Sequence, residues 1–315
     1  MDALFIMLRN VIIFVALAVP GFILAKTGKI KTDESNVLSK MLTFVGVPFL
    51  ILSNLMDISF DSNLLWEILI VVIIGAAFTF LCLFASAPLT KKEPDAKRRG
   101  MLRFTMICSN NGFLGIPLAQ AVFGNSPALT FLIVLNILTN IFMFTVGIYL
   151  ITGDKSTMDL KKAFLSPVLI SFLIGIIFNL LNVKAVVPDL SNYSSYFSAI
   201  VTPLSMTILG IKMASIKFPE MLKCKEMYIV SAFKLLIFPI LGVAFMILLN
   251  LLNIVSAPMV LGFFVAFATP TAALASTFSD QYNGDTQTAV YCTLGTTLFC
   301  VATVPVLYWI LCMLV

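Results

Sequence analysis

The chain contains no histidine, the residue that most often serves proteins as a general base, a proton relay or a metal ligand. Its six cysteines include no Cys-x-x-Cys pair, which indicates neither a disulfide framework nor a zinc site. Because few catalytic constellations remain without histidine or a buried acid, an enzyme is the function class that we favour least. We expect a protein without catalytic residues, metal or cofactor.

Charged residues are also scarce. They make up 11% of the 315 residues, against 60% hydrophobic residues, and the mean hydropathy is +1.06. These values are far from those of soluble domains and predict a polytopic membrane protein. The net charge of +5 does not predict nucleic-acid binding, because the basic residues fall in short loops between apolar runs.

Acidic residues are missing from the interior of the apolar runs. Those nearest to the runs lie at or beyond their ends: Asp57, Glu67, Asp189, Asp280 and Asp285. A proton-coupled carrier normally needs a buried carboxylate or histidine, so the expectation is a uniporter, an exchanger or a carrier that holds Na⁺ by carbonyls and hydroxyls. Only Lys234 sits well inside a run, where snorkelling of its amine to the interface is favoured over a contact with a transport site.

Ten apolar runs have about the 20 residues that a helix needs to cross a membrane. They cover 3–25, 37–56, 65–87, 101–123, 129–151, 164–183, 192–214, 228–251, 257–279 and 287–314. The expected fold class is therefore all-α, with ten transmembrane helices joined by short loops and no soluble domain. Asp2 and the lack of a small-residue cleavage motif indicate a retained first helix rather than a cleaved signal peptide.

Basic residues alternate from loop to loop. Of the 20 lysines and arginines, 18 fall on the side of the loops that follow the first, third, fifth and seventh runs. The positive-inside rule places that side in the cytoplasm. Both termini are then on the non-cytoplasmic side of a plasma or inner membrane. The loop 280–285 is expected inside but carries no basic residue.

The two halves of the chain contain matching residues at a nearly constant spacing. Three pairs of matching residues are 153 to 155 positions apart: Pro48 and Pro203, Gly21 and Gly175, Pro117 and Pro270. We predict a first five-helix repeat over 1–151, a short cytoplasmic linker over 152–163 and a second repeat over 164–315. Because each repeat has an odd number of helices, the second must be inverted in the membrane, as in secondary carriers.

The run 101–123 contains a stretch that a membrane helix should not have. From Ser109 to Pro117 it holds two amides, two glycines and a proline, which together unwind a helix. In hydrocarbon such a break is tolerated only where it lines a cavity or water. The free backbone amides around Phe113 to Gly115 would suit a carboxylate, and Asn110 would add its side-chain amide. A packing kink with interhelical amide bonds is the alternative.

A second break, Ala268 to Ala273, interrupts the run 257–279. Pro270 frees a carbonyl one turn earlier, and Thr269 and Thr271 add hydroxyls, unless these bond back to the preceding turn. Two broken helices, one in each half, indicate a transporter's substrate site. The predicted substrate-binding residues are Asn110, Asn111, Gly112, Phe113, Gly115, Pro117, Thr269, Pro270, Thr271 and Ala272. Four residues are assigned to the cavity wall: Pro48, Ser53, Pro203 and Gln120. The alternatives are structural kinks for the two prolines and an interhelical contact for Ser53.

The motif Asn110-Asn111-Gly112-Phe113-Leu114-Gly115-Ile116-Pro117-Leu118 resembles the helix 4 signature of the auxin efflux carrier family. That family includes the plant PIN auxin carriers and bacterial permeases for malonate, malate and other organic acids. The segment 270–273 with its exit loop 282–285, the segment 234–239 and the Val47-Pro48 pair are similar to the family as well. The resemblance covers essentially the whole chain. The loop of residues 152–163 is much shorter than that of the plant carriers, which marks a compact prokaryotic-type member.

The resemblance implies a scaffold of helices 1, 2, 6 and 7 and a transport domain of helices 3–5 and 8–10. It also implies crossed helices 4 and 9, an elevator-like motion and a homodimer joined through the scaffold. The expected function is secondary transport of a small organic anion, a mono- or dicarboxylate such as malate or malonate, or an auxin-like acid. A sodium-coupled symporter of the bile-acid type, and a channel or sensor, are the alternatives; Gln120 is the nearest candidate for a sodium ligand.

Overall fold

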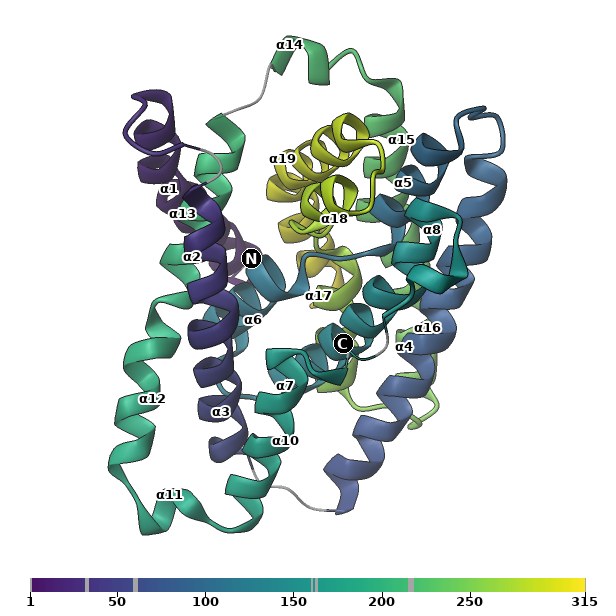
Figure 1. The fold of residues 1–315 in the computed structure, drawn as a ribbon. Coiled ribbons are helices and arrows are strands. Elements are labelled where there is room, and N and C mark those ends of the chain that lie inside the picture. Colours follow the sequence, from purple (N-terminus) through teal and green to yellow (C-terminus); the bar gives the residue numbers. More distant parts are fainter. Residues whose placement is uncertain are drawn as a thin grey trace.

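The computed structural model describes residues 2–31, 34–58, 62–159, 161, 164–214 and 218–314. Its regular elements, as far as the chain is described, are all helices (Figure 1). Those of the first half are α1 (Asp2–Lys26), α2 (Ser35–Met41), η2 (Leu42–Gly46), α3 (Val47–Asp57), α4 (Ser62–Leu89), α5 (Ala96–Ile107), η3 (Asn111–Gly115), α6 (Ile116–Phe123), α7 (Pro127–Phe142), η4 (Met143–Gly147), α8 (Ile148–Thr152) and η5 (Lys155–Thr157). Those of the second half are α10 (Pro167–Leu180), α11 (Val183–Val186), α12 (Asp189–Ala199), α13 (Val201–Ala214), α14 (Phe218–Met221), α15 (Lys225–Ala232), η6 (Phe233–Ile237), α16 (Phe238–Leu251), α17 (Ala257–Ala268), α18 (Ala275–Gln281) and α19 (Thr286–Leu311).

Six helical stretches are long and apolar enough to cross a membrane: Ser35–Met56, Asn63–Leu89, Pro127–Thr152, Asp189–Ala214, Lys225–Leu251 and Thr286–Leu311. Four shorter apolar helices accompany them: Ala16–Lys26, Asn111–Phe123, Pro167–Leu180 and Ala257–Ala268. All fall within or around the runs that the sequence predicts. The all-helical, multi-pass membrane character is thereby confirmed, whereas ten crossings in two inverted repeats stay a prediction.

Three helical stretches continue through a proline that follows a π-helical turn. Pro48, Pro117 and Pro239 each occupy the second position of an α-helix that directly follows a π-helical turn. A proline ring clashes with the carbonyl one turn earlier and offers no amide donor. The wider π turn gives the ring room and lets the helix continue.

The helices pack in two lobes (Figure 1). In the first lobe α1 lies along α13, and α3 packs against α10 and α12; in the second, α7 and α16 pack against α17, and α5 and α15 pack against α19. The first lobe lies at the left of the view and the second at the right. α1 also touches α19, and η3 touches α13, so the lobes meet along one boundary.

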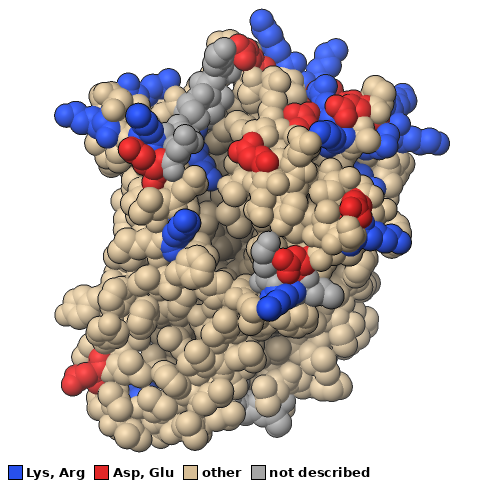
Figure 2. All heavy atoms as spheres, viewed as in Figure 1, with Lys and Arg blue, Asp and Glu red and all other residues tan. Residues whose placement is uncertain are grey.

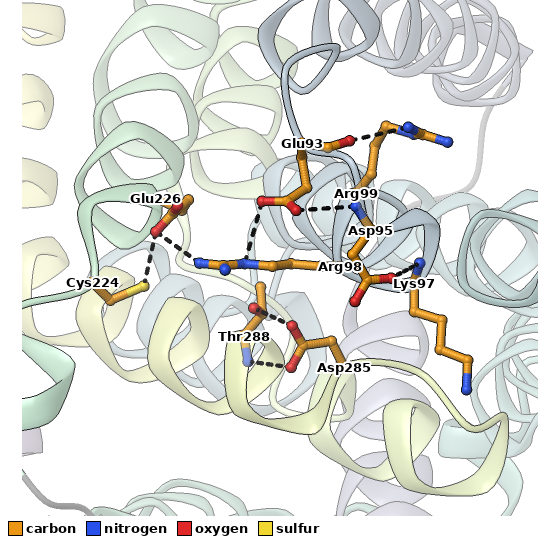
Figure 3. A network of polar contacts seen from close by, with 9 residues as sticks. All are labelled: Glu93, Asp95, Lys97, Arg98, Arg99, Cys224, Glu226, Asp285 and Thr288. Carbon is orange, nitrogen blue, oxygen red and sulfur yellow. Dashed lines mark hydrogen bonds and ion pairs between the residues drawn. The ribbon is translucent and has the colours of Figure 1, made fainter.

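Basic residues gather at one end of the molecule, the upper end of the face in Figure 2. There Arg98 joins two helices of the second lobe, with its Nη2 3.0 Å from Glu226 and its Nε 3.5 Å from Glu93 (Figure 3). Beside it, Asp285 caps α19 by accepting hydrogen bonds from the amide and hydroxyl of Thr288, at 3.1 and 2.7 Å. Partly exposed ion pairs contribute little free energy, but the Arg98–Glu226 pair links α5 to α15.

Two glycines allow α1 and α13 to approach closely. A Cβ atom at Gly210 would overlap the carbonyl oxygen of Ala18, and one at Gly21 would overlap the carbonyl oxygen of Thr207. The contact is thus reciprocal, with each helix placing a glycine against the other's backbone. Close backbone approach through small residues is a typical way for membrane helices to associate.

Replacement of Gly210 by alanine should therefore push the two helices apart. Overpacking of this kind costs about 1–3 kcal/mol, so we expect the G210A protein to unfold at a lower temperature in detergent. Ser195→Ala, an exposed change on α12, is the control and should leave the unfolding temperature nearly unchanged. Equal unfolding temperatures for G210A and the parent protein would contradict the close contact.

Candidate functional site

The two breaks cross in the interior of the second lobe. The peptide between α5 and η3 runs antiparallel to the peptide between α17 and α18. The amide of Asn110 donates to the carbonyl of Pro270 at 2.8 Å, and the amide of Ala272 donates to the carbonyl of Cys108 at 2.9 Å. Several of the backbone groups released by the broken helices are therefore paired across the crossing, which lowers the cost of burying them in a membrane protein.

The first break lies earlier than predicted. α5 ends at Ile107, and the chain is extended at Cys108 and turns at Asn110. The glycines and the proline that suggested the break belong to the next half-helix, with Gly112 in its first π turn and Pro117 in α6. Because the π turn accommodates the proline, the expectation that Pro117 unwinds this helix was wrong.

The free amides lie earlier as well. The amides of Leu114 and Gly115 donate to the carbonyl of Asn110, at 3.1 and 3.0 Å, so they are not available to a ligand as predicted. Within the described residues, the amides of 111–113 have no hydrogen-bond acceptor. These are the first amides of a helical segment that continues to Phe123, where the helix dipole favours a negative charge.

A cavity of about 70 Å³ lies beside the crossing. Its wall includes four of the predicted substrate-binding residues, Asn110, Gly112, Phe113 and Ala272. Further lining residues are Thr43, Val47, Ser109, Asn136, Asn140, Met143, Val168, Ala273 and Leu274. Three asparagine side chains and a helix start therefore border one small space.

Asn136 and Asn140 of α7 are the site residues that sequence reasoning missed. Asn136 is 3% exposed, and its side-chain Nδ2 has no hydrogen-bond partner in the part of the chain that the structure describes. An unpaired buried donor is costly, and here it borders the cavity. Their spacing could have identified them. Residues four apart lie on the same helix face, and two amide side chains on one face of an apolar helix indicate a polar site.

The other crossing residues hold the two breaks together rather than lining the cavity. Asn111 is fully buried, and its Oδ1 accepts a hydrogen bond from Thr269 Oγ1 at 2.9 Å. Thr271 Oγ1 donates to the carbonyl of Thr105 at 2.7 Å. Both threonines therefore bond across to the other broken helix, and the alternative that they bond back to their own preceding turn is wrong. Gly115 lies against Thr269 and Pro270 lies in the second break, whereas Pro117 lies in α6; none of the three lines the cavity.

The residues assigned to a cavity wall from the sequence lie outside this cavity. Four residues assigned to it do not line it: Pro48, Ser53, Pro203 and Gln120. The first lobe instead contributes Thr43 and Val47, because the turn before Pro48 faces the crossing and the proline itself does not. The Nε2 of Gln120 donates to Asn125 Oδ1 at 3.0 Å near the end of α6, away from the crossing.

Lys234 does not snorkel. It is 2% exposed, and its Nζ donates to the carbonyl of Ile107 at 3.3 Å and to the hydroxyl of Ser109. Ile107 ends α5, so its carbonyl is one that the break leaves without an intrahelical partner. The lysine satisfies this carbonyl and brings an ammonium group directly behind Ser109, which borders the cavity.

A family model described as "Membrane transport protein" matches residues 5–159 and 154–308. The chain belongs to this membrane transport protein family. It is the family of the auxin efflux carriers, so the resemblance noted in the sequence is confirmed. A relative from Methanothermobacter thermautotrophicus, described as an uncharacterized transporter, is 25% identical over 308 residues, which cover 94% of this chain and 96% of its own.

In this membrane transport protein, the Thr269–Asn111 bond should be needed for a stable crossing. Thr269→Val keeps the shape of the side chain but leaves the buried Asn111 Oδ1 without its donor, which costs about 1–3 kcal/mol. We expect a lower unfolding temperature in detergent. Thr269→Ser keeps the hydroxyl and should unfold close to the parent protein. A lower unfolding temperature for Thr269→Ser but not for Thr269→Val would show that the methyl group, not the hydrogen bond, matters.

Proposed function

We propose that the protein is a secondary carrier for a small organic anion, which binds in the cavity beside the crossing. The substrate is a mono- or dicarboxylate such as malate or malonate, or an auxin-like acid. The observation that carries this proposal is the unpaired Nδ2 of buried Asn136 in a wall shared with Asn110 and the start of a half-helix. The Nδ2 of Asn136 and the backbone amides of 111–113 have no hydrogen-bond acceptor within the described residues. The oxygens of a carboxylate can accept several hydrogen bonds.

The recognition chemistry follows from these donors. The side-chain amides of Asn110, Asn136 and Asn140 can each donate to a carboxylate oxygen, and the amides of 111–113 add backbone donors at the positive end of the helix dipole. The ammonium of Lys234 donates to the hydroxyl of Ser109, which lines the cavity, and so places a positive charge close to the substrate. Hydrogen bonds to an ionised group are shorter and stronger than neutral ones. The small cavity suits one carboxylate group of such a substrate.

Transport proceeds by alternating access of this site. The crossing lies in the second lobe, which would act as the transport domain of helices 3–5 and 8–10. The first lobe would be the scaffold, and of its described residues Thr43, Val47 and Val168 reach the cavity wall. Movement of the second lobe along the first would carry the closed crossing, with its substrate, from one face of the membrane to the other. The inverted repeats 1–151 and 164–315 would supply the two related end states.

The basic end of the molecule faces the cytoplasm in this proposal, as the positive-inside rule requires. Both termini are then non-cytoplasmic, and the linker 152–163, of which residues 160, 162 and 163 lie outside the described residues, is cytoplasmic. The protein resides in the plasma or inner membrane as a homodimer joined through the scaffold.

The first test is ligand-induced thermal stabilisation. Purified protein is heated with malonate, malate, acetate or an indole acid; a ligand present at 100 times its dissociation constant stabilises by about 2.7 kcal/mol. Asn136→Leu should abolish this shift without lowering the unfolding temperature of the ligand-free protein, because it replaces an unpaired polar group by an apolar one of similar size. Asn110→Ala should abolish both the shift and uptake into proteoliposomes. Gln120→Ala, outside the cavity, is the control and should keep both.

Other outcomes separate the alternatives. A shift that requires Na⁺, with coupled ²²Na⁺ uptake, would replace the proposal by a sodium symporter. Single-channel conductance in planar bilayers would replace it by a channel. If no organic anion shifts the unfolding temperature of the parent protein, the anion-carrier proposal fails.

A further inference from the structure

The two lobes leave space between them at the basic end of the molecule. A cavity of about 540 Å³ lies there, walled by the start of α2 and the end of α13 on one side and by α18 and the start of α19 on the other. The crossing cavity lies deeper, because the helix that begins with α2 continues through η2 and α3 to Thr43 and Val47 in its wall. The lobes are therefore apart on the basic side of the crossing.

On the other side of the crossing, the lobes are joined by a buried hydrogen bond. Thr130 Oγ1 of α7 donates to Asn54 Oδ1 of α3 at 3.2 Å, and both residues are fully buried. Thr130 precedes Asn136 of the cavity wall by six residues, and Asn54 follows Val47 by seven. At the rise of a helix, the bond lies about 10 Å from the crossing cavity along both helices. We call it the interlobe bond.

The directions of the two helices place this bond away from the basic end. The stretch Ser35–Met56 begins in the wall of the cavity at the basic end and runs away from it. The stretch Pro127–Thr152 runs the opposite way, because its last part, α8, packs against α5, whose first turn carries arginines of the basic end. The interlobe bond therefore lies beyond the crossing cavity as seen from the basic end.

The interlobe bond is polar although its surroundings are not. Its neighbours along both helices are buried and apolar, among them Ile51, Leu55, Leu129 and Phe131. The Nδ2 of Asn54 has no hydrogen-bond partner within the described residues, and a buried unpaired donor is costly. Contact of Asn54 with water would remove this cost. The arrangement therefore suits a contact that opens, because two apolar residues would join the lobes without an unpaired donor.

We propose that the interlobe bond is a gate, which closes the crossing cavity toward the end opposite the basic end. The inference rests on the movement of the second lobe along the first in the proposed function, and not on the chemistry of the anion. This movement separates α7 from α3 and breaks the bond. Water then reaches Asn54, and the crossing opens on that side while the space at the basic end closes.

The test is alkylation of a reporter cysteine in proteoliposomes by a charged maleimide that does not cross the membrane, added on the side opposite the basic end. Val134→Cys places the reporter one turn from Thr130 on the same face of α7, where Val134 is 5% exposed. Adding Thr130→Val should raise the alkylation rate about fivefold, the change in an equilibrium constant that loss of one hydrogen bond produces. Adding Thr130→Ser keeps the donor and should leave the rate unchanged. The protein without the reporter gives the background from its native cysteines.

A double variant separates the gate from a general loosening of the packing. Asn54→Leu combined with Thr130→Val replaces both partners by apolar groups, which leaves no buried donor or acceptor of this pair unpaired. The alkylation rate should then return to that of the reporter alone. Thr145→Val is the matched control in the same long helix, because Thr145 Oγ1 donates to the carbonyl of Ile141 in its own helix at 2.6 Å. It should leave the rate unchanged.

Two results would overturn the gate: an unchanged alkylation rate in Thr130→Val, or a double variant that is alkylated as fast as Thr130→Val. Leu50→Cys, one turn before Asn54 on α3 and 4% exposed, is the reporter for the same comparison if Val134→Cys does not fold. The assay contains no anion, so its failure is distinct from failure of the proposed function. The latter would show as a lack of thermal stabilisation of the parent protein by any organic anion.

Discussion

The structure depends on the pairing of two broken helices inside an apolar lobe. A helix that stops in hydrocarbon exposes amides and carbonyls that no water can satisfy. Here each break supplies the partners for the other: Asn110 to Pro270 and Ala272 to Cys108. Either break alone would leave backbone amides and carbonyls unpaired in hydrocarbon, so residues far apart in the sequence must fold against each other. The crossing is therefore needed for stability in the membrane, in addition to its part in the candidate site.

The same constraint places chemistry at the crossing. Pairing consumes most of the released backbone groups but leaves the first amides of η3 unbonded, next to the unpaired side chain of Asn136. Lys234 satisfies the last carbonyl of α5 and so sets a positive charge beside the cavity. The breaks therefore bring unpaired donors and a positive charge together inside a lobe whose buried side chains are mostly apolar.

Sequence reasoning succeeded where one residue type decides local structure, and failed where neighbours decide it. The breaks at Asn110 and Pro270 were found because glycine, proline and amides disfavour a helix in apolar surroundings. The first was placed too late, because a π turn before Pro117 relieves the clash. Asn136 was missed because it sits in an unbroken helix, and its position beside the crossing depends on how α7 packs. Lys234 was expected to reach the interface, but a carbonyl from a distant helix gives its amine a partner inside.

Hydropathy and breaker residues by themselves determined that this is a multi-pass helical membrane protein with one broken helix in each half. These are local properties, set by the cost of exposing polar backbone to lipid. Only the tertiary structure decided which donors remain unpaired, that Thr269 and Thr271 bind the opposite helix, and that Lys212 donates to the carbonyl of Ala273. Those outcomes depend on which helix faces which, because a polar group is free or satisfied only in relation to what the fold brings next to it.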